Sequence, residues 1–262
     1  MIELKSLAEI EEMAEAGAII HDLFAEVERR VEPGVSTLVL DAFAEEFIRS
    51  HDGAVPLFKG QYGFPGSLCT SINSEVVHGI PSDARRLAEG DIISVDVGVR
   101  RRGWCGDSAR TFAVGEVSDE AGELMAVTKL ALAAAVEATV PGKHVGDVGA
   151  AVEAAVRGSG FHIIRDLVGH GIGRELHEDP QVPNRGTAGE GPLLRAGMVL
   201  AIEPMVAVGT WRIRTLEDGW TLATADGSLS AHFEHTVAVT DAGPRVLTAP
   251  RERMTPALEM GS

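Results

Sequence analysis

The sequence repeats one succession of elements, and this repeat is the feature that most constrains the fold. Apolar residues at three- and four-residue spacing predict amphipathic helices in two pairs, and capping residues and Gly-containing turns mark their ends. The turn Pro33-Gly34 after the first helix recurs as Pro141-Gly142, 141 − 33 = 108 residues later. The four predicted helices span about residues 6–31, 37–50, 118–140 and 145–157.

The segments that follow each helix pair also match. Residues 90–96 and 197–203 are apolar runs that each end in a carboxylate, and residues 110–114 resemble 235–239. His78-Gly79-Ile80 recurs as His170-Gly171-Ile172. The chain is therefore predicted to form two helix-helix-strand-strand halves, about residues 1–115 and 116–250, within a single α/β domain over 1–262. Such halves pack about a pseudo-two-fold axis, and a central cleft would receive side chains from both.

Asp96 and Asp107 are predicted to lie together on a β-hairpin. A turn centred on Arg101-Arg102 would place the two carboxylates directly opposite each other, with Cβ atoms about 4.5–5.5 Å apart. Like charges at that distance repel and destabilise a sheet, so a divalent cation between them is the simplest compensation. The alternatives are a pair that shares one proton, or a slipped turn that places the two residues on opposite faces.

Two further carboxylates follow predicted buried strands. Glu203 ends the apolar run 198–202, and Pro204 then interrupts the strand. A buried carboxylate needs a partner; an arginine would serve, but the equivalence of Glu203 to Asp96 in the repeat favours a shared metal site. Glu234 lies in an alternating segment that corresponds to the strand of Asp107, and alternation turns the neighbouring His235 the other way, which predicts a structural role for that histidine.

His170 lies in the glycine-rich segment 169–173. A lone histidine in such a strand is more often structural than a ligand, and the glycine spacing is not that of a dinucleotide-binding loop. The four predicted carboxylates favour a ligand here. The predicted metal ligands are Asp96, Asp107, His170, Glu203 and Glu234.

This oxygen-rich set suits Mn²⁺, Fe²⁺, Co²⁺ or Zn²⁺. It provides enough donors for two ions about 3.5–4 Å apart, which lower the pKa of a water between them. The repeat favours Asp107 and Glu234 as bridging ligands. A soluble two-metal hydrolase is the predicted class of protein.

Composition and sequence pattern argue against several other classes of protein. The net charge of −16 disfavours binding to DNA or an anionic membrane, and Arg100-Arg101-Arg102 is interpreted first as a solvated turn. Two cysteines are too few for a disulfide scaffold. The N-terminus lacks a signal-peptide pattern, and no apolar run is long enough to span a membrane. A cytoplasmic location is expected.

The ordered set of motifs resembles that of type I methionine aminopeptidases, which have the pita-bread fold of two pseudo-symmetric halves around a central metal site. The resemblance covers about residues 2–250. The segments that carry it are 63–65, 69–73, 77–81, 95–97, 106–108, 169–173, 177–180, 202–205 and 233–236.

The resemblance implies roles for residues that the pattern alone does not assign. It implies the same five ligands, with Glu203 also moving a proton for the attacking water. His177 would stabilise the oxyanion, and His78 would bind the substrate amide. Phe64, Cys69 and Trp220 would line a pocket for the methionine thioether. Tyr62 and Leu176 depart from the usual residues of the family, which leaves their roles open.

The implied activity is N-terminal methionine excision from nascent proteins and peptides with a small second residue. A monomer and a weak ribosome contact through Arg100, Arg101 and Arg102, or through Arg212 and Arg214, are expected as well. The alternatives are a proline-specific aminopeptidase or dipeptidase of the same fold, and a non-catalytic binding protein on that fold.

Overall fold

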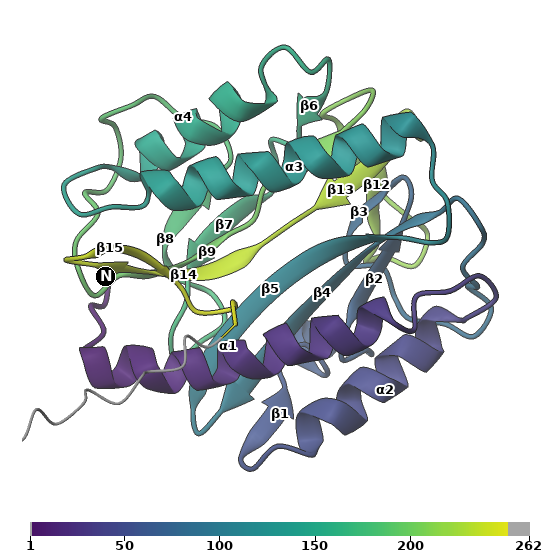
Figure 1. Ribbon diagram of the computed structural model, residues 1–262, viewed down its shortest axis with the longest axis horizontal. Coiled ribbons are helices and arrows are strands. Elements are labelled where there is room, and N and C mark those ends of the chain that lie inside the picture. The colour runs from purple at the N-terminus through teal and green to yellow at the C-terminus, as the bar shows by residue number, and fades with distance from the viewer. Residues whose placement is uncertain (1, 251–262) are drawn as a thin grey trace, which may run out of the picture.

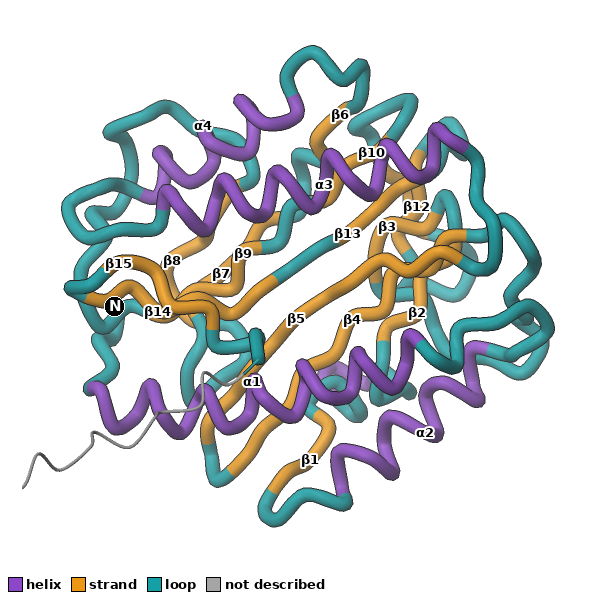
Figure 2. Tube along the Cα trace, viewed as in Figure 1, coloured by secondary structure: helices purple, strands orange, loops and turns teal. Residues whose placement is uncertain are grey.

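A computed structural model describes residues 2–250 of the chain (Figure 1). Met1 and residues 251–262 of the predicted domain lie outside the described part. Two pairs of helices enclose the strands, which Figure 2 draws in orange between the purple helices. The helices are α1 (Leu7–Glu28), α2 (Thr37–Arg49), α3 (Asp119–Ala138) and α4 (Val145–Val156).

The predicted start of α1 is confirmed in atomic detail. The Ser6 hydroxyl accepts a hydrogen bond from the backbone N–H of Glu9 at 3.4 Å, and the Glu9 carboxylate accepts one from the backbone N–H of Ser6 at 2.8 Å. This reciprocal capping box satisfies backbone donors that the first turn of a helix leaves free. The predicted helix pairs are present in both halves of the sequence.

Each helix pair covers one main sheet. In the first half, β4 (Ile92–Arg101) pairs with β5 (Trp104–Ala113) on one edge and with β1 (Ala54–Pro56) and β2 (Cys69–Ile72) on the other. In the second half, the strand order is β15-β14-β9-β7-β8. These strands are β7 (Val168–Gly171), β8 (Glu178–Pro183), β9 (Val199–Ile202), β14 (His235–Thr240) and β15 (Gly243–Val246).

Two smaller sheets have three strands each. One has the order β13-β10-β6 and the other β11-β12-β3. Because β3 comes from the first half and β12 from the second, the latter sheet ties the halves together. Their strands are β3 (Glu75–Val77), β6 (His162–Ile163), β10 (Met205–Ala207), β11 (Ile213–Thr215), β12 (Leu222–Thr224) and β13 (Ser230–His232).

The hairpin of β4 and β5 has a different register from the predicted one. Arg101 pairs with Trp104, so the turn consists of Arg102 and Gly103, both with positive φ (50° and 85°), as two-residue hairpin turns of type I′ require. Asp96 therefore faces Ala109, and Asp107 faces Gly98. The predicted direct opposition of the two aspartates was wrong. The displacement is two residues, which keeps both side chains on the same face.

The buried face of α3 also differs from the prediction. The three- and four-residue spacing that predicts this helix places Leu130 on its apolar stripe, but Leu130 is 63% exposed. Thr128 is fully buried instead, and its hydroxyl donates to the carbonyl of Leu124 at 2.7 Å. An internal hydrogen bond of this kind offsets the cost of burying the hydroxyl, so polar Thr128 lies on the buried face of the helix while Leu130 lies on the exposed one.

The halves meet in a reciprocal contact between β5 and residues 232–236, which run from the end of β13 to the start of β14. The Thr236 hydroxyl accepts from the backbone N–H of Asp107 at 2.9 Å and donates to its carbonyl at 2.7 Å. The Thr111 hydroxyl makes the same two bonds to His232, each 2.9 Å long. Each threonine thus binds a residue four positions before its counterpart, as a pseudo-two-fold axis requires.

Among the described residues, no helix has the combination of length and apolarity needed to cross a bilayer.

Candidate metal centre

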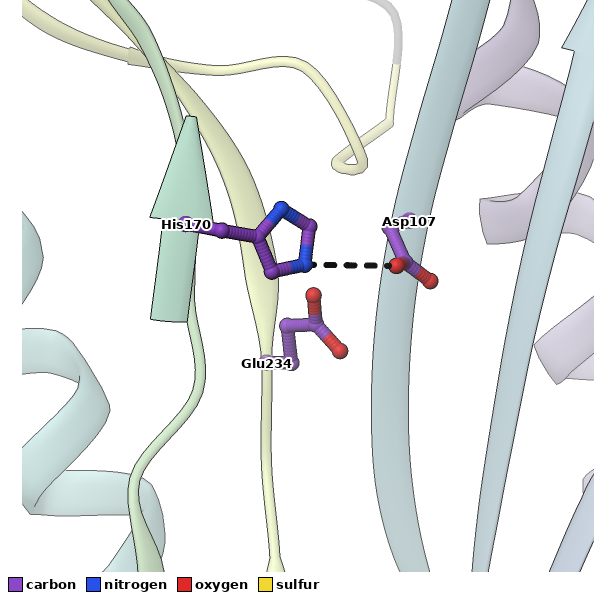
Figure 3. Close-up of side chains that lie close together, drawn as sticks. All are labelled: Asp107, His170 and Glu234. Atoms are coloured by element: carbon purple, nitrogen blue, oxygen red, sulfur yellow. Dashed lines mark ion pairs between the residues drawn. The ribbon is translucent and has the colours of Figure 1, made fainter. Parts of the chain in front are cut away.

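The seam between the halves brings three predicted ligands together. Asp107 on β5, His170 on β7 and Glu234 before β14 point toward one another (Figure 3), and each offers one ligand atom within 4.8 Å of the other two. His170 Nε2 lies 3.9 Å from Asp107 Oδ2. Separations of this size suit donors around a common ion, since metal–oxygen and metal–nitrogen distances are about 2.0–2.2 Å.

The other two predicted ligands, Glu203 and Asp96, lie beside these three. Glu203 directly follows β9, and its Oε1 lies 3.6 Å from His170 Nε2. The Glu203 carbonyl accepts from the side-chain amide of Asn184 at 2.9 Å, which holds the residue where the strand ends. Asp96 lies close enough to Asp107 for the two carboxyl groups to affect each other's pKa. All five side chains line one cleft of about 650 Å³.

The four carboxylates are buried together with too few hydrogen-bond partners. Oδ1 of Asp96, Oδ1 of Asp107 and Oε1 of Glu234 are buried oxygens without a partner. Burial raises the pKa of Asp96 to about 7. Burial, and then the charges of neighbouring carboxylates, raises the pKa of Asp107, Glu203 and Glu234 well above the usual range. A cation between them would supply both the missing partners and the compensating charge.

His170 is prepared to act as a neutral ligand. Its Nδ1 lies 2.9 Å from the carbonyl of Gly171, so that nitrogen carries the proton and donates it. Nε2 is left with its lone pair toward the carboxylates, an arrangement typical of metal-binding histidines. Burial, and then the neighbouring His177, lowers the pKa of His170 to about 4, so the ring is neutral at physiological pH.

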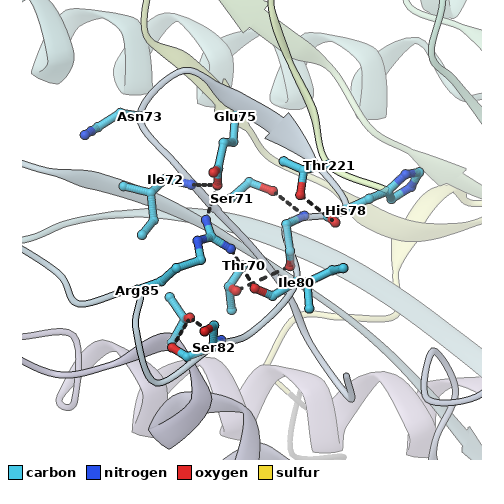
Figure 4. A network of polar contacts seen from close by, with 12 residues as sticks. Thr70, Ser71, Ile72, Asn73, Glu75, His78, Ile80, Ser82, Arg85 and Thr221 are labelled. Carbon is cyan, nitrogen blue, oxygen red and sulfur yellow. Dashed lines mark hydrogen bonds and ion pairs between the residues drawn. The ribbon is translucent and has the colours of Figure 1, made fainter. Parts of the chain in front are cut away.

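His78 reaches the cleft from a strained loop. Its φ of 60° is in the left-handed region, and a polar network holds the surrounding residues (Figure 4). Glu75 accepts from the backbone N–H of Ile72 at 2.7 Å and forms an ion pair with Arg85, which also donates to the carbonyl of Ile80 at 2.7 Å. The network fixes both sides of His78. Desolvation, and then His177, lowers its pKa.

His177 lies against the metal ligands and is anchored through its neighbour. Its ring centroid is 4.5 Å from that of His170. The next residue, Glu178, forms an ion pair with Lys5, whose side chain is almost completely buried at 3% exposure. The backbone N–H of Lys5 donates to the carbonyl of Gly197 at 2.7 Å. The N-terminal segment therefore supports the strand that presents His177.

An apolar recess adjoins the carboxylates. The rings of Phe64 and Trp220 meet edge to face with centroids 5.3 Å apart, and the buried thiol of Cys69 lines the same cleft. Leu176 is buried in this lining, whereas Tyr62 is 81% exposed at the edge of the cleft. The structure thus places all ten predicted site residues in the lining of one cleft.

Met205 and His232 are among the cleft residues that were not predicted. Met205 lines the apolar side, and His232 is buried with Nε2 3.9 Å from Glu234 Oε2 and without a hydrogen-bond partner on that nitrogen. Burial, and then His78, lowers the pKa of His232 to about 3. The sequence feature that could have predicted His232 is alternation, because residues 232 and 234 face the same way in an extended segment.

Comparisons with known proteins match these features. The model of metallopeptidase family M24 matches residues 11–241. The chain is 52% identical to a methionine aminopeptidase of Clostridium acetobutylicum over 95% of this chain and 99% of that protein. It is similar to the crystal structure of methionine aminopeptidase from Thermotoga maritima, with a TM-score of 0.93 and 46% identity over 95% of this chain and all of that one. A Pyrococcus horikoshii prolidase has the same fold at a TM-score of 0.76 and 23% identity, and the match covers 64% of that longer chain.

Proposed function

This chain belongs to metallopeptidase family M24, and we propose from that membership that its cleft removes the N-terminal methionine of nascent proteins and peptides whose second residue is small. It is a metal-dependent aminopeptidase of the pita-bread fold, and we propose a single catalytic domain over residues 1–262. The substrate assignment depends on one observation: the four carboxylates and the apolar recess of Phe64, Cys69 and Trp220 line the same cleft.

Two divalent ions are the proposed cofactor, drawn from Co, Mn, Fe and Zn. The orphaned carboxylate oxygens and the free Nε2 of His170 fit such ions, since they are hard donors in a buried and negatively charged setting. When bound, two ions lower the pKa of a shared water and supply hydroxide near neutral pH. Asp107 and Glu234 are the proposed bridging residues, with Asp96 on one side and His170 and Glu203 on the other.

Three side chains are proposed to carry out proton transfer and to bind the substrate. Glu203 is the proposed proton acceptor for the attacking water and the donor to the departing amine. His177 would donate a hydrogen bond to the scissile carbonyl oxygen, where negative charge develops. His78 would bind the substrate amide on the side of the leaving group. The low pKa of both histidines, caused by desolvation, keeps them neutral, so each ring has one N–H to donate.

The recess accounts for methionine as the first residue. Two aromatic rings in edge-to-face contact and a neutral thiol form a polarizable wall, and thioethers make favourable contacts with aromatic edges. Burial raises the pKa of Cys69, so the thiol carries no charge that would need solvation. Leu176 adds an aliphatic contact to this wall.

The remaining proposals concern the cellular location, oligomeric state and partners of the protein. We propose a cytoplasmic monomer that contacts the ribosome weakly and binds neither DNA nor membrane. Arg101 and Arg102 form ion pairs with Glu15 (3.3 Å) and Asp52 (3.1 Å), so little free positive charge is left on that turn for RNA. Co-sedimentation of the parent chain and of a variant with Arg212 and Arg214 replaced by Gln tests the contact. Absence of the parent from the ribosome pellet would refute it.

The decisive experiment is removal of metal by a chelator, followed by re-addition of each ion with two tripeptides. Met-Ala-Ser should be hydrolysed only after metal is restored, and Ala-Pro-Ala should resist. Preferential cleavage of Ala-Pro-Ala would instead support the proline-specific alternative. Failure of every metal to bind, together with no hydrolysis, would support a non-catalytic binding protein.

A further inference from the structure

A second cavity lies behind the metal centre, on the helical side of the seam. This rear cavity has a volume of about 450 Å³ and lies between α1 and α3 over β5 and residues 233–235. Figure 1 shows these strands passing between the two helices. Its lining residues are Glu28, Ser108, Ala109, Arg110, Thr111, Phe112, Ala113, Met125, Ala126, Lys129, Leu132, Phe233, Glu234 and His235.

The two cavities lie back to back across one layer of backbone. Asp107 points into the cleft, and the next residue, Ser108, lines the rear cavity. Phe233 and His235, on either side of Glu234, also line the rear cavity. Successive side chains of an extended segment point to opposite faces, which places the two sites on opposite sides of the strands that carry metal ligands.

The rear cavity contains a cation without an acidic partner. Among the described residues, no carboxylate lies within ion-pairing distance of the Arg110 guanidinium, and no hydrogen bond engages it. The group instead lies over aromatic rings, with Cζ 5.3 Å from the centroid of Phe24 and 5.8 Å from that of Phe112. Burial lowers the pKa of Arg110, and only the more distant charge of Glu28 opposes this effect. In a chain of net charge −16, an unpaired and partly desolvated arginine requires an explanation.

Further basic groups surround the same space. Lys129 lines the cavity from α3, and His235 lines it from the start of β14. Nδ1 of His235 is engaged by the Thr248 hydroxyl at 2.8 Å, which leaves Nε2 as the free ring nitrogen. Only Glu28 and the buried Glu234 are acidic among the lining residues.

We propose that the rear cavity binds a small organic anion, a carboxylate or phosphate monoester with an apolar body. Arg110 and Lys129 would bind the anionic group, since arginine recognises both anions through paired N–H donors. Phe112, Leu132 and Phe233 would contact the apolar body. The volume exceeds that of a bare phosphate and is within the usual range of small-molecule sites, about 300–1,000 Å³. This proposal does not depend on the proposed function.

Calorimetric titration with phenyl phosphate, benzoate and inorganic phosphate tests the proposal, on both metal-loaded and chelated protein. In the chelated protein we expect one site, because the metal-free cleft is lined by carboxylates and repels anions. The metal-loaded protein should keep this site with the same affinity within about twofold, in addition to any anion bound by the metal ions. Inorganic phosphate should bind more weakly than phenyl phosphate. The stronger of phenyl phosphate and benzoate identifies the preferred anion.

Three variants and a control locate the site. Arg110→Gln and Lys129→Gln should each weaken binding about tenfold, and Glu28→Gln should strengthen it. Arg157→Gln, an exposed arginine at the end of α4 and outside the cavity, should have no effect. Lys129 and Glu28 are exposed, so these variants are expected to fold. No binding at millimolar ligand, binding that requires metal, or equal affinity in all variants would overturn the proposal.

Discussion

Glu203 illustrates how one residue can satisfy two requirements at the metal centre. It directly follows a fully buried strand, and its pKa is raised first by burial and then by Asp107 and Asp96. A carboxylate that is costly to ionise gains most from a bound cation, and a raised proton affinity suits a group that accepts a proton from water. The same burial therefore favours both ligation and proton transfer.

Replacement of Glu203 by Gln should lower kcat for Met-Ala-Ser by at least about 100-fold, the usual contribution of a general base. The amide has nearly the same shape, so the circular dichroism spectrum and thermal midpoint should stay near those of the parent. Turnover at the parental rate would exclude the proposed proton transfer.

Replacement of Asp107 by Ala should reduce the metal content from two ions per chain to one or none, since a bridging carboxylate serves both ions. Plasma mass spectrometry after dialysis measures the stoichiometry. Asp179→Ala, outside the proposed ligand set, provides a comparison that should keep two ions. Two tightly held ions in the Asp107 variant would refute the bridging assignment.

At the scale of elements, Thr111 on β5 and Thr236 on β14 make equivalent contacts across the seam, but only the contact of Thr236 holds a proposed metal ligand. Thr236 bonds to both backbone groups of Asp107, whereas Thr111 bonds to those of His232, which is not a proposed ligand. Both threonines are buried. The pseudo-symmetry therefore supplies a natural pair of matched positions.

Thr236→Val should destabilise the protein by about 1–3 kcal/mol, because a buried backbone N–H loses its acceptor. It should also weaken metal binding through displacement of Asp107, and Thr236→Ser should restore both properties. Thr111→Val should lower stability to a similar extent and leave metal affinity unchanged. Urea unfolding and competition with a metal-binding dye measure the two effects. Equal loss of metal affinity in both valine variants would contradict a specific role for Thr236.

At the scale of the whole molecule, metal binding and pH should jointly control stability. The folded metal-free protein holds carboxyls of raised pKa, about 7 for Asp96 and well above 4.5 for Glu203 and Glu234. In the unfolded chain these groups ionise near pH 4. The folded state therefore binds more protons than the unfolded state, and stability falls as pH rises through the folded pKa values.

The thermal midpoint of the chelated protein should fall between pH 6.5 and 8.5. Histidines with lowered pKa, such as His170 at about 4, have the opposite effect, but only between their folded pKa and about 6.5. Above that value they are neutral in both states. With saturating Mn²⁺ the decline should disappear, because ligation compensates the ionised carboxylates. A midpoint of the chelated protein that rises or stays constant over this range would contradict the proposed charge balance.

Much of the molecule could be predicted because its signals are local. Capping residues, apolar periodicity and Gly turns define the four helices, and the repeat relates the apolar runs that lead to Asp96 and Glu203. The hairpin register could not be predicted in the same way. Only Gly103 favours the positive φ that the observed turn requires, and Arg102 adopts it without such a preference, so the local sequence does not distinguish this turn from one centred a residue away.

The sequence by itself determined which side chains are available for metal binding, in which order, and on two equivalent halves, since periodicity and duplication are properties of the chain. Only the tertiary structure decided that Met205 joins the cleft and that Arg110 and Lys129 line one rear cavity. Those neighbours come from elements far apart in sequence. Their proximity depends on how two helix-covered sheets pack along one seam, and no local pattern records that packing.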